Sequence, residues 1–143
     1  MKNRVSEAKR WFSQALQDLD DAKFNLSGRR YNVACFLAQQ SVEKALKAYL
    51  FVKGAEEVWG HSTTELCKDA ESFDSEFSTL ESNASSLDKY YIPTRYPNAL
   101  PGGIPSQAFD EEDAKRAIFL AEKIIEFIKS KLKEESSTAP TYE

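Results

Sequence analysis

The 143-residue sequence has few of the residues that build metal sites, disulfide scaffolds or phosphate-binding loops. It contains one histidine, His61, and two cysteines, Cys35 and Cys67. They are too few and too widely spaced for a metal constellation, so we expect no metal and no other cofactor. Two cysteines within helical patterns favour a reduced, cytoplasmic protein over a disulfide scaffold. The glycine pair at 102–103 lacks the lysine of a phosphate-binding P-loop.

Long hydrophobic runs and an excess of positive charge are also missing. No apolar run reaches the roughly 18 residues that cross a bilayer, and no signal peptide opens the chain, so we expect no membrane insertion. The formal net charge of −4 gives no general attraction to nucleic acid or anionic lipid. Any nucleotide or RNA site must be a local basic patch, and extended nucleic-acid binding is not expected. No stretch alternates apolar and polar residues for long enough to indicate a strand.

Helical periodicity, in contrast, covers most of the chain. Apolar spacing predicts long helices over residues 6–26, 31–53 and 111–133, with Ser6 and Asp110 as N-caps of the first and the last. Ser62 opens a capping box that begins a short helix to about residue 72, and residues 83–91 read as another short helix. The fold class predicted is an all-α antiparallel bundle of three long helices plus one or two short ones. We expect one helical domain over residues 1–134 and a disordered C-terminal tail over 135–143.

The middle helix is apolar over most of its circumference, which is typical of a buried central helix. We expect Phe36 and Leu46 to be buried there, and Gly54 to end the helix in a left-handed conformation. One polar row interrupts the apolar surface: Gln40, Glu43, Lys44 and Lys47 share one face. The row can be a solvated stripe with an ion pair between Glu43 and Lys47, or a buried network that lines a ligand site.

Residues 92–109 form a proline-rich loop, long for a compact domain. It follows and contains a group of aromatic residues around a cation: Tyr90, Tyr91, Arg95 and Tyr96. Such rings can stack on a nucleobase while the arginine binds phosphate. Alternatively, the prolines stiffen the loop and the tyrosines close the end of the bundle, or the same residues anchor a dimer.

Two blocks of the sequence resemble the HEPN family, the "higher eukaryotes and prokaryotes nucleotide-binding" domains. The block A-C-F-L-A-Q-Q-S-V-E-K-A-L-K-A (34–48) resembles the second helix of that family. The block L-D-K-Y-Y-I-P-T-R-Y-P-N (87–98) resembles its loop signature before the last helix. The resemblance covers about residues 6 to 132. Within the family, the connecting sequence is similar to the C-terminal HEPN domain of sacsin, a very large chaperone-like protein.

The resemblance implies a non-catalytic domain that binds a purine nucleotide of the GTP or ATP class and forms a homodimer, as part of a larger chaperone-like protein. The residues expected at the nucleotide are Lys44, Lys47, Arg95, Tyr90, Tyr91 and Tyr96. Gln40 and Glu43 are expected to form a structural network beside them, with Glu43 holding Arg95, because a buried carboxylate needs a cation or several donors. The alternatives are a pure dimerisation module with a vestigial pocket and a metal-independent ribonuclease.

The ribonuclease alternative is weakened by a missing histidine. Many HEPN proteins are metal-independent ribonucleases whose motif is an arginine followed four to six residues later by a histidine. After Arg95 the corresponding positions hold Ala99, Leu100 and Pro101. The general acid or base that phosphodiester cleavage requires is therefore absent from the motif. His61 lies upstream, beside the capping box, where we expect it to have a local structural role.

Overall fold

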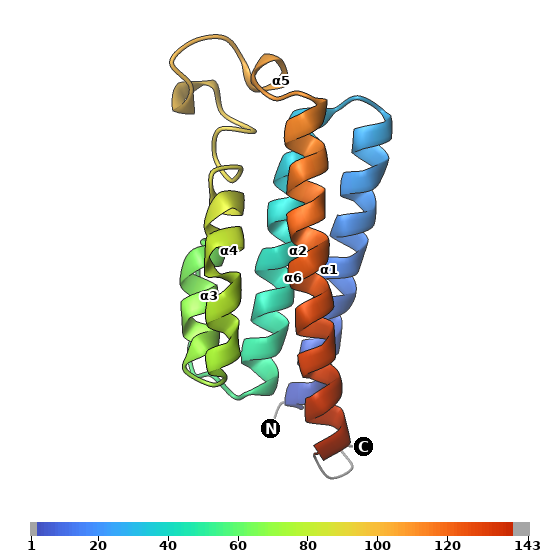
Figure 1. Cartoon of the computed structure of the whole chain (residues 1–143), viewed down its shortest axis with the longest axis vertical. Helices are drawn as coiled ribbons and strands as arrows, with labels where there is room; N and C mark the ends of the chain where they lie inside the picture. The colour runs from blue at the N-terminus through green and yellow to red at the C-terminus, as the bar shows by residue number, and fades with distance from the viewer. Residues whose placement is uncertain (1–2, 139–143) are drawn as a thin grey trace.

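The computed structural model describes residues 3–138 as helices joined by turns and one long loop, without strands in that range (Figure 1). The α-helices are α1 (Arg4–Ser27), α2 (Tyr31–Val52), α3 (Thr63–Glu71), α4 (Glu81–Asp88), α5 (Pro105–Ala108) and α6 (Glu111–Thr138). Two 3-10 helices, η1 (Ser75–Leu80) and η2 (Pro97–Ala99), lie between them. The prediction of an all-α bundle is confirmed. None of the helices within residues 3–138 is long and apolar enough to cross a membrane.

The three long helices lie alongside one another, and α3 and α4 form a shorter pair beside α2 (Figure 1). A tight turn joins α1 to α2, so the two helices pack antiparallel as predicted. In this turn Arg29 adopts a positive φ of 62°. α2 is the central helix, because it packs against α1, α3 and α6. Leu46 on α2 is fully buried, as expected. Phe36 is only half-buried, which corrects its assignment to the core.

Side-chain capping explains where α1 and α3 begin. The side-chain oxygen of Asn3 accepts hydrogen bonds from the backbone N–H groups of Val5 (2.9 Å) and Ser6 (3.1 Å). The first helix therefore starts at Arg4, and the prediction that Ser6 is its N-cap was wrong. Ser62 caps α3 as predicted, since its hydroxyl accepts the N–H of Glu65 at 3.1 Å.

The last helix is longer than its sequence pattern predicted. Asp110 caps it as expected, accepting the N–H of Asp113 at 2.9 Å. α6 continues through Thr138, so residues 135–138 are helical where a disordered tail was predicted. An ion pair between Glu135 and Lys53, at 2.8 Å, attaches this end of α6 to the end of α2 and helps to explain the difference. The rest of the predicted tail, 139–143, lies outside the described residues.

Candidate functional site

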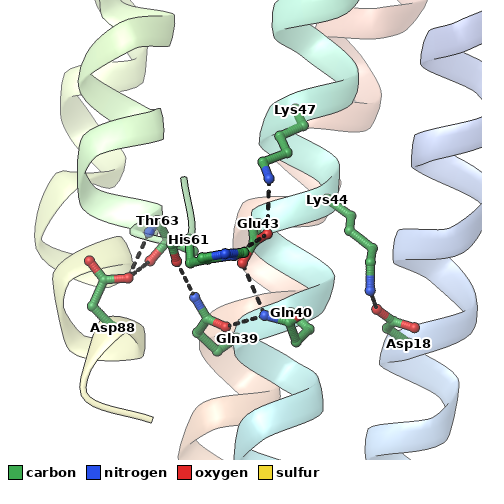
Figure 2. Close-up of polar contacts among 9 residues, drawn as sticks. All are labelled: Asp18, Gln39, Gln40, Glu43, Lys44, Lys47, His61, Thr63 and Asp88. Atoms are coloured by element: carbon green, nitrogen blue, oxygen red, sulfur yellow. Dashed lines mark hydrogen bonds and ion pairs between the residues drawn. The ribbon is translucent and has the colours of Figure 1, made fainter. Parts of the chain in front are cut away.

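Glu43 is the centre of a buried polar network on α2 (Figure 2). Its carboxylate accepts hydrogen bonds from the ammonium group of Lys47 at 3.1 Å and from the amide of Gln40 at 3.0 Å. The Nδ1 atom of His61 lies 3.3 Å from the same carboxylate. Only 4% of Glu43 is exposed, so these partners replace the water that an exposed carboxylate would bind. The polar row is therefore a buried network at Glu43, and the solvated-stripe interpretation does not hold there.

Gln39, which the sequence reasoning missed, connects this network to the loop before α3. It is fully buried, and its amide nitrogen donates to the backbone carbonyl of His61 at 2.8 Å. Its oxygen accepts from Gln40 at 2.9 Å. Gln39 and Glu43 are one helical turn apart, so both can face the segment that carries His61. Their spacing was the available signal for this second polar position.

Asp88, at the end of α4, holds the first residues of α3 and so holds the segment that carries His61 (Figure 2). Its carboxylate accepts the hydroxyl of Ser62 at 2.7 Å, the N–H and hydroxyl of Thr63 at 2.6 and 2.7 Å, and the N–H of Thr64 at 3.1 Å. Burial raises the pKa of Asp88, but these hydrogen bonds lower it by more, so the pKa lies below its ordinary value. The loop that carries His61 is therefore firmly attached where it enters α3.

A second group of side chains, which we call the Arg95 cluster, comprises Phe36, His61, Tyr91, Arg95 and Tyr96. The guanidinium carbon of Arg95 lies 4.4 Å from the ring centre of Phe36, 4.6 Å from that of Tyr91 and 4.9 Å from that of Tyr96. Its Nε atom donates to the carbonyl of Tyr91 at 2.9 Å. The imidazole of His61 stacks on Tyr91, with ring centres 4.9 Å apart and an interplanar angle of 17°. Arg95 and His61 thus contact the same tyrosine ring.

The prediction that Glu43 holds Arg95 was wrong. Glu43 is bonded to Lys47, Gln40 and His61 instead. The guanidinium of Arg95 lies against aromatic rings and bonds a carbonyl four residues earlier in its own loop. Among residues 3–138 the structure shows no carboxylate paired with Arg95, so its positive charge is oriented but not neutralised by an acid.

The predicted meeting of Lys44, Lys47 and Arg95 at one cleft is not observed. Figure 2 shows Lys44 reaching toward α1, away from His61, and it forms an ion pair with the buried Asp18. The ammonium group of Lys47 is buried beside Glu43 and lies 5.5 Å from the ring centre of Trp11. Lys47 lies four residues after Glu43, about one helical turn, and so stays beside it. Lys44 is the next residue after Glu43, so it is rotated by about 100° around the helix axis and faces α1 instead.

Comparison with known proteins now places the chain in a family. The HEPN domain family model matches residues 8–132. This chain belongs to the HEPN family. The archaeal protein "Putative toxin MJ1304" of Methanocaldococcus jannaschii is 30% identical over 139 residues, with 91% of each chain covered.

Two crystal structures resemble this HEPN domain along nearly their whole length. TT1696 from Thermus thermophilus has a TM-score of 0.82 at 40% identity, and the match covers 91% of this chain and 99% of that one. ST0689, described as an archaeal HEPN homologue, has a TM-score of 0.74 at 35% identity, with 92% and 99% covered. These relatives are standalone prokaryotic HEPN proteins, which corrects the finer resemblance to sacsin and to a chaperone.

Within the loop signature of this HEPN domain, the three tyrosines have different environments. Tyr90 is 2% exposed and packs edge-on against Phe109, with ring centres 6.0 Å apart. Burial raises the pKa of Tyr90 to about 12. Tyr90 therefore belongs to the core, as the bundle-closing interpretation predicts. Tyr91 is half-buried in the Arg95 cluster, and Tyr96 is 47% exposed. Tyr91 and Tyr96 are the tyrosines of the signature that a ligand can reach.

His61 is the site residue whose environment the sequence did not predict. Its side chain is 59% exposed, yet its ring is oriented by Glu43 at one edge and Tyr91 on one face. These contacts go beyond the local structural role that we expected beside the capping box. Within residues 3–138, His, Cys, Asp and Glu side chains form no group of three that could hold a metal ion. The side chains that the structure brings together around Tyr91 are an arginine, a histidine and aromatic rings.

Proposed function

We propose that this HEPN domain binds a purine nucleotide of the GTP or ATP class at the Arg95 cluster and releases it unchanged. The observation that carries the proposal is the arrangement of Arg95, whose guanidinium is held by three rings and a carbonyl without an acidic partner among residues 3–138. A guanidinium of this kind is suited to phosphate, because its remaining N–H groups form a planar fork. The exposed ring of Tyr96 is available for stacking on the base.

Electrostatics make the proposed site selective for phosphate-rich ligands. The protein carries a net charge of −4, so Arg95 is a local positive centre on a negative molecule. Triphosphates should bind more tightly than monophosphates, and affinity should fall as salt concentration rises. Lys47 contributes only through the network, because its charge is balanced by Glu43.

The test is calorimetric titration of the domain with ATP and GTP at low salt. An Arg95→Ala variant should lose about tenfold or more in affinity, since a hydrogen bond to a charged group contributes roughly 1.5–3 kcal/mol. Arg10→Ala is a matched control, because Arg10 is an exposed arginine on α1 with 73% of its side chain exposed. Equal affinities of the parent and Arg95→Ala, with unchanged helical circular dichroism, would remove Arg95 from the site.

A second candidate function is metal-independent RNA cleavage. One observation favours it: His61, bonded to Glu43, contacts the same ring as Arg95 although it lies outside the arginine-to-histidine motif. The relative MJ1304 also carries the word toxin in its name. A positioned general base contributes typically about 100- to 10,000-fold to such a reaction.

The missing motif histidine leads us to expect that the purified domain leaves single-stranded RNAs intact without metal. The measurement is gel analysis of a panel of labelled RNAs incubated with the domain in a chelating buffer. Cleavage that disappears in both His61→Ala and Arg95→Ala would overturn the non-catalytic proposal in favour of the ribonuclease. Cleavage that persists in both variants would show that neither His61 nor Arg95 takes part in it.

We also propose that the domain is a homodimer with the 87–105 loop near the seam. This loop exposes the ring of Tyr96, the side chain of Ile92 and two prolines, Pro97 and Pro101. Surfaces of this kind are buried between pairs of identical subunits. The alternative of a dimerisation module with a vestigial pocket predicts the same dimer without nucleotide binding, so the titration above separates the two.

A further inference from the structure

The hydrogen-bonding state of His61 follows from its contact with Glu43. Nδ1 of the imidazole lies 3.3 Å from a carboxylate oxygen that also accepts from Lys47. An ionised carboxylate can only accept, so Nδ1 must carry the proton in this contact. In the neutral imidazole the other nitrogen, Nε2, then has a lone pair and can only accept. The buried network on α2 thereby selects the tautomer of an exposed ring.

The orientation of that acceptor is also determined. The ring of His61 is stacked on Tyr91 and bonded at its Nδ1 edge, while 59% of the side chain is exposed. Gln39 holds the backbone carbonyl of His61, and Asp88 holds the next three residues. Within residues 3–138 the structure gives Nε2 no hydrogen-bond partner. An oriented acceptor that is open to solvent at a ligand site is suited to a hydroxyl or amino group of the ligand.

We propose that Nε2 of His61 accepts a hydrogen bond from the 2′ hydroxyl of the ribose, so that the site selects ribonucleotides over deoxyribonucleotides. The inference rests on the proposed nucleotide binding at Arg95. Arg95 and His61 both contact the ring of Tyr91, at 4.6 and 4.9 Å from its centre, so one nucleotide can reach both side chains. The sugar is the part of a nucleotide that adjoins its phosphate, whatever the base. A ribose hydroxyl is also the group by which proteins distinguish ribonucleotides from deoxyribonucleotides.

The test compares ATP, 2′-deoxy-ATP and 2′,3′-dideoxy-ATP in calorimetric titrations of the full chain. Loss of the recognised hydroxyl should weaken binding about three- to tenfold, the usual range for one neutral hydrogen bond. The deoxy analogue reports the 2′ hydroxyl, and the dideoxy analogue adds the 3′ hydroxyl. Because the phosphates are unchanged, the contact with Arg95 is the same for all three ligands.

Two variants of His61 test whether its Nε2 atom is the group that accepts the hydroxyl. His61→Phe keeps a ring that can stack on Tyr91 but has no acceptor, so it should bind all three nucleotides with the weaker affinity. His61→Gln places an amide oxygen near the position of Nε2 and should restore part of the preference for ATP. Circular dichroism of each variant checks that the helices are intact.

Three results would overturn the inference, and they differ in what they say of the nucleotide site. Equal affinities of the parent for ATP and 2′-deoxy-ATP would reject recognition of the 2′ hydroxyl while nucleotide binding stands. A preference for ATP that survives in His61→Phe would assign the hydroxyl to another residue. A parent that binds none of the three nucleotides would contradict both ribose recognition and the proposed function.

Discussion

At the residue scale, Asp88 illustrates how one carboxylate organises a site that it does not line. It accepts hydrogen bonds from three consecutive residues at the start of α3. Two of these donors are backbone N–H groups that no helical carbonyl can satisfy at an N-terminus. The negative charge also complements the positive end of the helix dipole. Asp88 therefore stabilises the helix and, through Ser62, the position of His61.

We predict that Asp88→Asn lowers the free energy of unfolding by about 1.5–3 kcal/mol at pH 7, since hydrogen bonds to a charged acceptor are lost. The pKa of Asp88 is lowered by folding. Its contribution is therefore present above the unfolded pKa of about 4 and is lost as the pH falls through the lower folded value. Urea unfolding between pH 7 and pH 2 should show the difference from the parent shrinking below about pH 4. Asp20→Asn, at an exposed position on α1, is the control; a pH-independent difference for Asp88→Asn would contradict the assignment.

The planar shape of the Arg95 guanidinium, and not only its charge, leads to a second prediction at the residue scale. A planar guanidinium can stack on Phe36, Tyr91 and Tyr96, whereas an ammonium group is a compact point charge. Arg95→Lys should therefore weaken nucleotide binding about two- to fivefold although the charge is kept, because a cation–π contact contributes about 0.5–1 kcal/mol at exposed sites. Titration with ATP at two salt concentrations measures this. Full affinity in Arg95→Lys would mean that charge alone recruits the nucleotide.

At the scale of the element, α2 has two roles: it is the central helix of the core, and it carries the polar residues that contact His61. Its apolar residues pack against α1, α3 and α6, and its polar row is buried where it meets the His61 loop. Burying that row costs desolvation, which the mutual bonding of Glu43, Lys47 and Gln40 offsets. The rigid packing of α2 therefore fixes the position of the carboxylate that orients His61.

We predict that Leu46→Ala lowers the free energy of unfolding by about 2–5 kcal/mol, from lost transfer energy and the cavity left in the core. Leu46 is fully buried on α2, whereas Leu16 on α1 is 43% exposed. Leu16→Ala is thus the matched control and should cost less than about 1 kcal/mol. Urea unfolding at pH 7 gives both values. Similar costs for the two variants would mean that the buried face of the bundle is misassigned.

At the scale of the whole molecule, the loop that follows α4 combines a positive charge with exposed apolar side chains. The loop beyond α4 exposes Ile92 (40%) and Tyr96 (47%) beside Arg95, which has no acidic partner among residues 3–138. The amide of Asn32 donates to the carbonyl of Thr94 at 3.0 Å, which ties this loop to the start of α2. An exposed apolar group held on a fixed backbone is suited to a protein interface.

We predict that the domain sediments as a dimer at tens of micromolar, with this loop near the two-fold seam. Ile92→Asp should shift the mass toward one chain, because it would bury a charge in the seam. Phe24→Asp, at a 76% exposed position on α1, should leave the mass unchanged. Sedimentation equilibrium measures all three proteins. A parent that sediments as a single chain would refute the dimer.

Much of the fold could be predicted because its determinants are local. Helical spacing, the Ser62 and Asp110 caps and the left-handed Gly54 all act within a few residues of sequence. Burial of α2 also followed from its own apolar circumference. The N-cap of α1 was predicted wrongly: Asn3 rather than Ser6 caps this helix, because either residue type can accept the first N–H groups.

The sequence by itself therefore determined the helical bundle, the buried central helix and the presence of a cation among aromatic rings. Only the tertiary structure decided which partners meet. Glu43 finds His61 18 positions away, and Lys44 finds Asp18 26 positions away. Helical periodicity tells which residues share a face but not which side chain of another element lies opposite that face. That choice depends on how the helices pack and where the loops end. For this reason the sequence did not predict that His61 contacts Glu43, or that Lys44 and Lys47 pair with acidic residues away from Arg95.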